Sequence, residues 1–265
     1  MDRFIDIHNH LIPEFDDGPK TVSESLDMLK MALDQGITEV FATSHFTEYI
    51  PEKVKTEYCN KLQALREEAL AHNLKINIYS GAELFFHHYL DETVRKNRIT
   101  TLGGFGQYVL LEFPMFQSPE GVEDVLFRLS VDQFIPIVAH PERYNAVMEN
   151  STLVHQYIRH GALLQVNAGS IMGDFGKAVQ ETAMELLENQ LIHFIASDAH
   201  SSSERKFRLR EVYQTLKEHL PQAYLQKLLY QNPRSIIDEV VLEKVALPAE
   251  PEKEGLIKKI LRFFQ

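Results

Sequence analysis

The sequence predicts an α/β fold in which seven β/α units form a distorted, TIM-like barrel. Seven short apolar runs are mostly β-branched or aliphatic with little alternation, as in parallel strands that are covered on both faces. Segments with helical periodicity separate most of these runs, and strands that alternate with helices form a parallel sheet. A β/α barrel needs roughly 250 residues as a single domain, and the chain has 265 residues.

The predicted elements follow one another along the chain. The predicted strands span residues 3–8, 37–43, 76–81, 108–113, 135–139, 163–166 and 192–196, and the predicted helices span residues 22–35, 54–72, 119–132, 152–160, 177–189 and 205–219. Ser118 and Pro119 suit the start of the third helix. Residues 9–11, Asn-His-Leu, follow the first strand in place of a glycine-rich loop, which disfavours an open dinucleotide-binding sheet.

The composition is that of an ordinary globular protein with an excess of acidic residues. Apolar residues make up 44% of the chain, and the net charge is -11. Proteins that bind a nucleic-acid backbone normally carry a basic surface, so we expect no nucleic-acid partner. Cys59 is the single cysteine, which excludes an intrachain disulfide and fits a cytoplasmic location. We expect no secretion signal and no transmembrane segment, because the apolar runs are too short for either.

The end of the chain differs in composition from the rest. Residues 247–255 read LPAEPEKEG, a charged, proline-rich linker, and residues 256–265 read LIKKILRFFQ, a short basic amphipathic segment. We therefore expect one domain over residues 1–245 and a separate tail over residues 246–265. The amphipathic segment could be a weakly docked terminus, or it could bind a membrane surface or a partner.

Residues that commonly bind metal ions lie at or just after the ends of six of the seven predicted strands. In a parallel barrel these ends point to one face, where active sites are built, so we expect the side chains to converge. Burying several carboxylates together without cations would cost several kcal/mol per unpaired ion. Nine ligands are too many for one tetrahedral ion and suit two or three. They are His8, His10, Asp17, His45, Glu83, Glu112, His140, Asp198 and His200.

The motifs that contain these residues resemble those of the polymerase-and-histidinol-phosphatase (PHP) superfamily. The motifs are HNH at residues 8–10, DDGP at 16–19, TSH ending at His45, GAE ending at Glu83, LLEF around Glu112, AHPERY at 139–144 and SDAH at 197–200. More narrowly, DDGPKT, AHPERY and the Asn-Pro-Arg at residues 232–234 resemble the bacterial capsule- and exopolysaccharide-associated protein tyrosine phosphatases. The match runs from about residue 4 to about residue 240.

The resemblance implies a PHP fold with three divalent ions, manganese or iron, with zinc as an alternative. It assigns His8, His10, Glu83 and Asp198 to one ion, Glu83, Glu112 and His140 to a second, and Asp17, His45 and His200 to a third. Arg143 and Arg205 match positions that grip the phosphate. Tyr144 could line the substrate mouth or could pack in the interior. The proton for the leaving group could come from metal-bound water, Asp198 or a histidine.

The resemblance also implies a partner, the phosphorylated tyrosine-rich tail of a membrane-bound autokinase of polysaccharide export. Four alternatives remain at this point: a histidinol-phosphate or other small-molecule phosphatase, a nuclease, an amidohydrolase and a catalytically silent binding module. Amidohydrolases commonly have lysine at the fourth strand end, where this chain has Glu112. The cysteine mechanism for phosphotyrosine is excluded, because it needs an arginine six positions after the cysteine and residue 65 is leucine.

Overall fold

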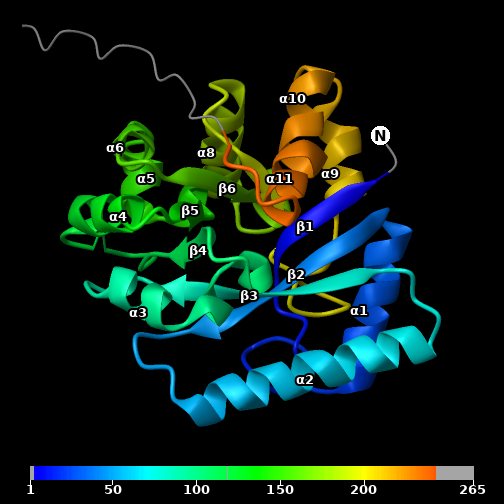
Figure 1. Cartoon of the computed structure of the whole chain (residues 1–265). Coiled ribbons are helices and arrows are strands. Elements are labelled where there is room, and N and C mark those ends of the chain that lie inside the picture. Colours follow the sequence, from blue (N-terminus) through cyan, green and yellow to red (C-terminus); the bar gives the residue numbers. More distant parts are fainter. Residues whose placement is uncertain (1–2, 118, 243–265) are drawn as a thin grey trace, which may run out of the picture.

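The computed structural model describes residues 3–117 and 119–242, and this part of the chain forms a seven-stranded parallel sheet that curls into a nearly closed barrel (Figure 1). Neighbouring strands follow the chain order from β1 to β7. The strands are β1 (Phe4–Asn9), β2 (Ile37–Phe46), β3 (Asn77–Phe85), β4 (Tyr108–Glu112), β5 (Ile135–Ala139), β6 (Leu163–Asn167) and β7 (Phe194–Ala196). The predicted fold class and all seven predicted strands are confirmed.

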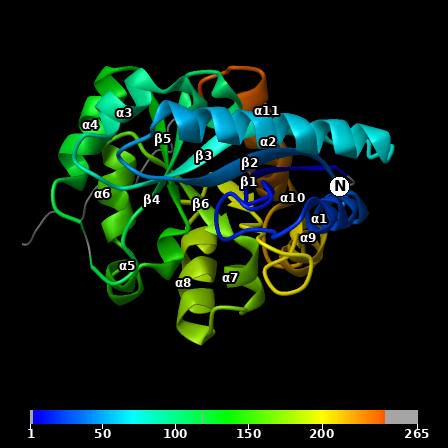
Figure 2. The ribbon, with the colours of Figure 1, turned by 90° about the horizontal axis from the view of Figure 1, so that it is seen from below.

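Helices surround the sheet on its outer face. Figure 2 shows α2 along the outside of β2 and β3, with α7 and α8 on the opposite side of the barrel. In the described residues the α-helices are α1 (Val22–Asp34), α2 (Glu52–Ala71), α3 (Leu90–Lys96), α4 (Val122–Val131), α5 (Asn145–Glu149), α6 (Leu153–Arg159), α7 (Ala168–Met172), α8 (Lys177–Glu188), α9 (Leu209–Leu216), α10 (Gln222–Gln226) and α11 (Asn232–Ile237).

Two of the predicted helices begin three or four residues later than the sequence suggests. Helix α4 begins at Val122 instead of residue 119, because Gly121 turns the chain with a positive φ of 73°. Helix α9 begins at Leu209 instead of residue 205, so Arg205 lies in the loop before the helix. The short helices α3, α5, α7, α10 and α11 were not predicted, because segments of five to seven residues give too weak a periodic signal.

Strands β2 and β3 are longer than predicted, and the difference affects the site. The predicted strands end at residues 43 and 81, whereas the observed strands continue to Phe46 and Phe85. The added residues stay in register, so that His45 pairs with Glu83 across the ladder. These two predicted metal ligands are therefore held by backbone pairing and do not lie in loops.

The barrel closes between β1 and β7 through single contacts in place of a continuous ladder. The Asp198 N–H donates to the carbonyl of His8 (2.8 Å), and the His10 N–H donates to the carbonyl of Ala199 (2.8 Å). Below them the buried Asp6 carboxylate accepts hydrogen bonds from the backbone N–H and the hydroxyl of Ser197, both at 2.7 Å. The closure thus joins the two chain segments that carry His8, His10 and Asp198.

The inside of the barrel is an apolar layer, and α11 covers its lower end. The interior side chains come from alternate strand positions and include Ile5, Leu110 and Phe194, with Ile236 of α11 packed among them. The Tyr108 hydroxyl donates to the carbonyl of Val240 (2.6 Å) and accepts from the N–H of Leu242 (3.0 Å). The polar side chains of the predicted ligands lie at the opposite end of the barrel, where the strands terminate.

The predicted tail over residues 246–265 lies outside the described residues, and the division at residue 245 stays a prediction. Within residues 3–117 and 119–242, the structure contains no helix with the length and apolar character needed to cross a membrane.

Ile236→Ala is expected to lower the free energy of unfolding by about 3 kcal/mol, because it leaves a cavity in a closed interior. Urea unfolding followed by circular dichroism measures the change. The control is Val241→Ala, at a side chain that is 64% exposed, which should change stability by less than about 0.5 kcal/mol. Equal effects of the two substitutions would contradict the assignment of α11 as the floor of the barrel.

Candidate metal centre

All nine predicted ligands come together at the carboxyl ends of the strands, around Glu83. The Glu83 Oε2 atom lies 3.2 Å from His8 Nε2, 3.3 Å from His10 Nε2 and 3.2 Å from His45 Nδ1. The other carboxylate oxygen, Oε1, lies 3.1 Å from His140 Nε2. Strands β1, β2, β3 and β5 therefore direct side chains to one point.

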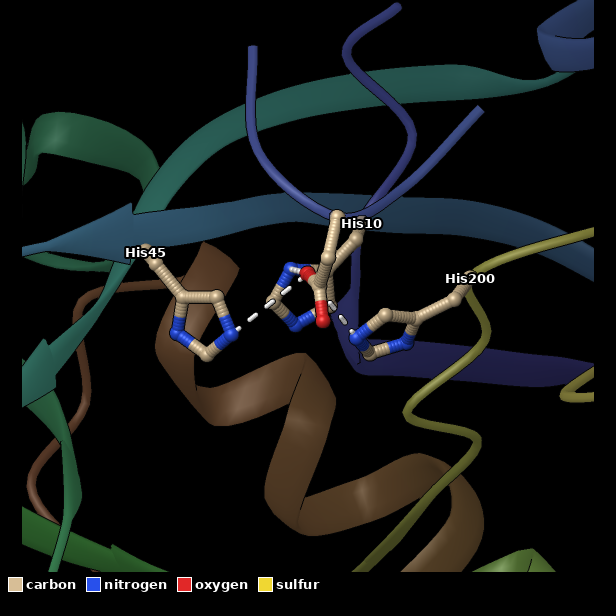
Figure 3. A group of neighbouring side chains, drawn as sticks. His10, His45 and His200 are labelled. Atoms are coloured by element: carbon tan, nitrogen blue, oxygen red, sulfur yellow. Dashed lines mark ion pairs between the residues drawn. The ribbon is translucent and has the colours of Figure 1, made fainter. Parts of the chain in front are cut away.

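The possible ligand atoms form three overlapping groups. In each group, all ligand atoms lie within 4.8 Å of one another. The groups are His10, Asp17, His45 and His200; His8, His10 and Asp198; and His45, Glu83 and Glu112. Figure 3 shows the imidazoles of His10, His45 and His200 converging from three different segments. The groups share three, three and two residues with the sets predicted for the third, first and second ion, respectively. His140 lies outside all three groups, but its Nε2 is 3.7 Å from Glu112 Oε1.

Three of the imidazoles are oriented by a hydrogen bond at Nδ1. Nδ1 of His8 is 2.8 Å from Gln165 Oε1, and Nδ1 of His10 is 2.8 Å from Asp16 Oδ2. Nδ1 of His200 is 2.9 Å from the carbonyl oxygen of Asp198. Because these acceptors are satisfied by a hydrogen on Nδ1, Nε2 is the nitrogen directed at the cluster, and it can bind a metal ion once it has lost its own proton.

The inward-facing nitrogens have no hydrogen-bond partner in the structure. Nε2 of His8, His10 and His200 is buried and makes no hydrogen bond. Buried polar atoms are rarely left without a partner, because the loss of solvation costs free energy. Three such nitrogens beside a buried carboxylate are the donor set that a divalent cation would satisfy.

The pKa values of the Glu83 and Glu112 carboxyl groups are shifted in opposite directions. Burial, together with the negative charge of Glu83, raises the pKa of Glu112 to about 8. Burial would also raise the pKa of Glu83, but the charge of His8 and the close contacts with the His10 and His140 imidazoles hold it well below the usual range. A protein without cations keeps a proton on one of these groups, and bound cations would replace that proton.

The two oxygens of Asp198 face different neighbours. Its Oδ1 lies 3.4 Å from His8 Nε2 and 3.5 Å from His200 Nδ1. Its Oδ2 accepts from Asn167 Nδ2 at 2.6 Å, from Arg143 Nη1 at 3.3 Å and from Arg205 Nη2. Asp198 thus connects the predicted metal ligands to the two arginines that were predicted to grip the phosphate.

Two predicted ligands have a left-handed backbone conformation, which is uncommon outside glycine. His140 follows β5 with a φ of 33°, and Asp198 follows β7 with a φ of 53°. Such conformations are often found at functional sites, where the surrounding structure enforces them. The sharp turn after β5 also places Arg143 in the 3-10 turn Pro141–Arg143, from which it reaches Asp198.

Tyr144 is buried, and its position agrees with the packing role of the two that the sequence allowed. Its hydroxyl donates to the carbonyl of Ala139 (2.6 Å) and accepts from the N–H of Phe113 (2.9 Å). Only 3% of the residue is exposed. With its hydroxyl engaged by two backbone groups, Tyr144 supports the turn that carries His140 and Arg143.

Several residues of the centre were missed by the sequence analysis because they support ligands without being ligands. Asp16 accepts from His10, from the N–H of Gly18 (3.0 Å) and from the N–H of His45 (3.1 Å). Gln165 Nε2 donates to Asn167 Oδ1 (2.8 Å), so β6 links His8 to Asp198 through two amide side chains. The available signal was that these two amides are the polar residues of an otherwise apolar sixth strand.

A parallel barrel with histidines and carboxylates at its strand ends is the architecture of a metal-dependent hydrolase. The chain matches the family described as capsular polysaccharide synthesis, CpsB/CapC, over residues 4–238. This protein therefore belongs to the CpsB/CapC family, and the predicted relationship is confirmed.

The relatives include proteins that are named for a phosphatase activity. Tyrosine-protein phosphatase CpsB of Streptococcus agalactiae is 30% identical over 88% of this chain and 98% of its own length. Tyrosine-protein phosphatase YwqE of Bacillus subtilis is 28% identical over 98% of this chain and 100% of its own length. One similar crystal structure comes from work on YwqE of Bacillus subtilis and CpsB of Streptococcus pneumoniae, which are described as unique metal-dependent tyrosine phosphatases. The superposition covers 93% of this chain and 99% of that chain, with a TM-score of 0.86 and 28% identity.

More distant structures share the fold alone. A β-aspartyl dipeptidase of Fervidobacterium islandicum covers 89% of this chain and 72% of that chain, with a TM-score of 0.54 and 17% identity. For an organophosphorus hydrolase of Deinococcus radiodurans, the superposition covers 88% of this chain and 92% of that chain, with a TM-score of 0.56 and 11% identity. The β/α barrel is common to all of these proteins.

Gln165→Leu is expected to weaken binding of divalent metal by about 10- to 100-fold, because the substitution removes the acceptor that orients His8. Calorimetric titration of the chelator-treated protein with manganese measures the affinity. Gln214→Leu, on the exposed face of α9, is the matched control and should bind metal like the wild type. An unchanged affinity in Gln165→Leu would show that the amide has no orienting role.

Proposed function

We propose that this protein is a metal-dependent protein tyrosine phosphatase that hydrolyses the phosphoester of phosphotyrosine in a protein substrate. We further propose that His8, His10, Asp17, His45, Glu83, Glu112, His140, Asp198 and His200 hold three divalent ions, manganese or iron, with zinc as the alternative. Arg143 and Arg205 would bind the phosphoryl group. The enzyme class and the chemistry agree with those of the tyrosine-protein phosphatases in the family.

The observation that carries this proposal is the position of two arginines beside a cluster of metal-binding side chains. Arg143 and Arg205 donate to one oxygen of Asp198, whose other oxygen faces His8 and His200. Phosphoryl transfer depends mainly on positioning and on neutralising negative charge. Cationic side chains directly beside a divalent-metal site meet both requirements for a phosphate dianion.

Bound divalent ions would lower the pKa of a water molecule that they bind, and they would neutralise negative charge on the phosphoryl oxygens. Arg143 and Arg205 contribute guanidinium donors that suit bidentate contact with phosphate. Asn167 and the arginines keep the Asp198 carboxylate oriented. Gln165 and Asp16 keep two imidazoles turned inward.

Asp198 is a poor source of the leaving-group proton. Burial would raise its pKa, but the charges of His8, Arg205 and His200 hold it well below the usual range. The group therefore stays ionised near neutral pH. A tyrosine phenolate leaves more easily than an alkoxide, so the reaction with phosphotyrosine has little need for a strong acid.

One side of the centre is open to the surface, which suits a large substrate. The side chains of Asp17 and His45 are 58% and 36% exposed, whereas those of His8, Glu83 and Asp198 are at most 2% exposed. A phosphotyrosine side chain extends far from the backbone of its own chain and can enter from this side. A closed pocket, as expected for a small phosphorylated metabolite, would bury these two residues as well.

The substrate that we propose is the phosphorylated tail of a membrane-bound tyrosine autokinase of capsular or exopolysaccharide synthesis. The family is described by capsular polysaccharide synthesis, and the tail of such a kinase would lie on the cytoplasmic side of the membrane. We accordingly propose a cytoplasmic location. We also propose a catalytic domain over residues 1–245 and a tail over residues 246–265.

Removal and restoration of metal tests the activity directly. The chelator-treated protein is expected to be inactive, and manganese, iron or zinc should restore hydrolysis, fastest on a phosphotyrosine peptide. A phosphoserine peptide, histidinol phosphate and a short DNA are the competing substrates. His45→Ala should lower kcat/KM by about 100-fold or more, because a lost ligand costs more than a lost supporting contact.

The control for this experiment is His72→Ala, because the His72 side chain is 48% exposed at the end of α2. It should leave the rate unchanged. A preference for histidinol phosphate would keep the centre and overturn the substrate, whereas no metal-dependent hydrolysis of any of the four substrates would overturn the proposed activity.

Arg143→Lys is expected to raise KM for the phosphotyrosine peptide by about tenfold, because lysine keeps the charge but loses the bidentate geometry. Steady-state kinetics at saturating manganese measures the change. Arg95→Lys, at a guanidinium that is 54% exposed and paired with Asp132, is the surface control. An unchanged KM in Arg143→Lys would indicate that Arg143 does not contact the phosphate.

A further inference from the structure

The ring of Phe175 lies against both arginines of the centre. The guanidinium carbon of Arg143 is 4.4 Å from the ring centroid, and that of Arg205 is 5.9 Å from it. Both distances fall within the range of a cation–π contact, in which the negative face of an aromatic ring attracts a cation. Phe175 belongs neither to the predicted ligands nor to the residues that were expected to touch the substrate.

The contact with the ring lies where two cations share one acceptor atom. Arg143 and Arg205 both donate to Oδ2 of Asp198. The Nε atom of Arg205 is buried and has no hydrogen-bond partner. Two guanidinium groups on one carboxylate oxygen repel each other, and the carboxylate compensates only one of the two charges. The face of Phe175 offers further negative potential at the place where the charges accumulate.

The loop that carries Phe175 is anchored by an ion pair at the neighbouring residue. It connects α7 to α8, and Asp174 binds Arg208 through both carboxylate oxygens, at 2.8 and 2.6 Å. Arg208 belongs to the segment between β7 and α9 that also carries Arg205, and Figure 2 shows this segment beside α7. A Cβ atom at position 169 would lie 3.0 Å from Cε2 of Phe175, so Gly169 leaves the space that the ring occupies.

We propose that Phe175 is a positioning residue, which holds Arg143 and Arg205 through its ring face so that their free donors are directed at an incoming phosphoryl group. Affinity for the phosphoryl group then depends on the aromatic face at position 175 and not merely on its volume. The inference rests on the proposed function only for the identity of the ester, because inorganic phosphate presents the same group to the arginines.

Replacement of the ring tests this inference. Phe175→Leu keeps an apolar side chain and loses the aromatic face, and Phe175→Tyr keeps the face. In the manganese-restored full-length protein, Phe175→Leu should weaken calorimetric binding of inorganic phosphate by about three- to tenfold. KM for a phosphotyrosine peptide should rise by a similar factor while kcat changes less than about twofold. Phe175→Tyr should restore both values to within about twofold of the wild type.

A double-mutant cycle shows whether the effect acts through the arginine. In an Arg143→Ala background, Phe175→Leu should change phosphate affinity by less than about twofold, because the guanidinium nearer to the ring is absent and Arg205 lies 5.9 Å from the ring centroid. Phe127→Leu, at an aromatic side chain that is 61% exposed on α4, is the control and should bind phosphate like the wild type.

Three outcomes would overturn the inference: unchanged phosphate affinity in Phe175→Leu, an equal loss in Phe175→Tyr, or a full effect that persists without Arg143. A melting temperature within a few degrees of the wild type establishes that each variant is folded. Failure of the proposed function is separate, since it would appear as absent peptide hydrolysis in the wild-type protein. The phosphate titration decides the role of Phe175 in either case.

Discussion

Four imidazoles approach the two oxygens of Glu83, and this contact sets the geometry of the whole centre. Glu83 is 1% exposed, and it lies in a sheet position whose neighbour in β2 is His45. His8, His10 and His140 reach the same carboxylate from β1 and from the turn after β5. The strand ends must therefore stand at one level, and a shift of one residue in any register would turn a ligand away from the carboxylate.

Asp198 connects the histidine cluster to the two arginines that are proposed to bind the phosphoryl group. One of its oxygens belongs to the histidine cluster, and the other holds Arg143, Arg205 and the amide of Asn167. The backbone of Asp198 also closes the barrel by its hydrogen bond to His8. Closure of the fold, orientation of a ligand and placement of two cations thus depend on the same residue.

The barrel separates an apolar layer from a polar one. Ile5, Leu110 and Phe194 fill the interior below the centre, and α11 covers the lower end. The nine predicted ligands are consequently confined to the upper end, where most of them are buried and electrostatic interactions are strong. The pKa values of Glu83 and Glu112, displaced in opposite directions, follow from this confinement.

The sequence by itself determined the barrel, the seven strands and the nine residues that converge, because apolar runs and strand-end motifs are local patterns. Tertiary structure alone decided how these residues are supported. The amides of β6 act through His8 and Asp198, and Phe175 acts through arginines that are 32 and 30 positions away in the chain. The late start of α9, which leaves Arg205 free to reach Asp198, was likewise unpredictable. Orienting contacts join residues that are distant in sequence, and no periodicity or motif records which of them will meet in the folded chain.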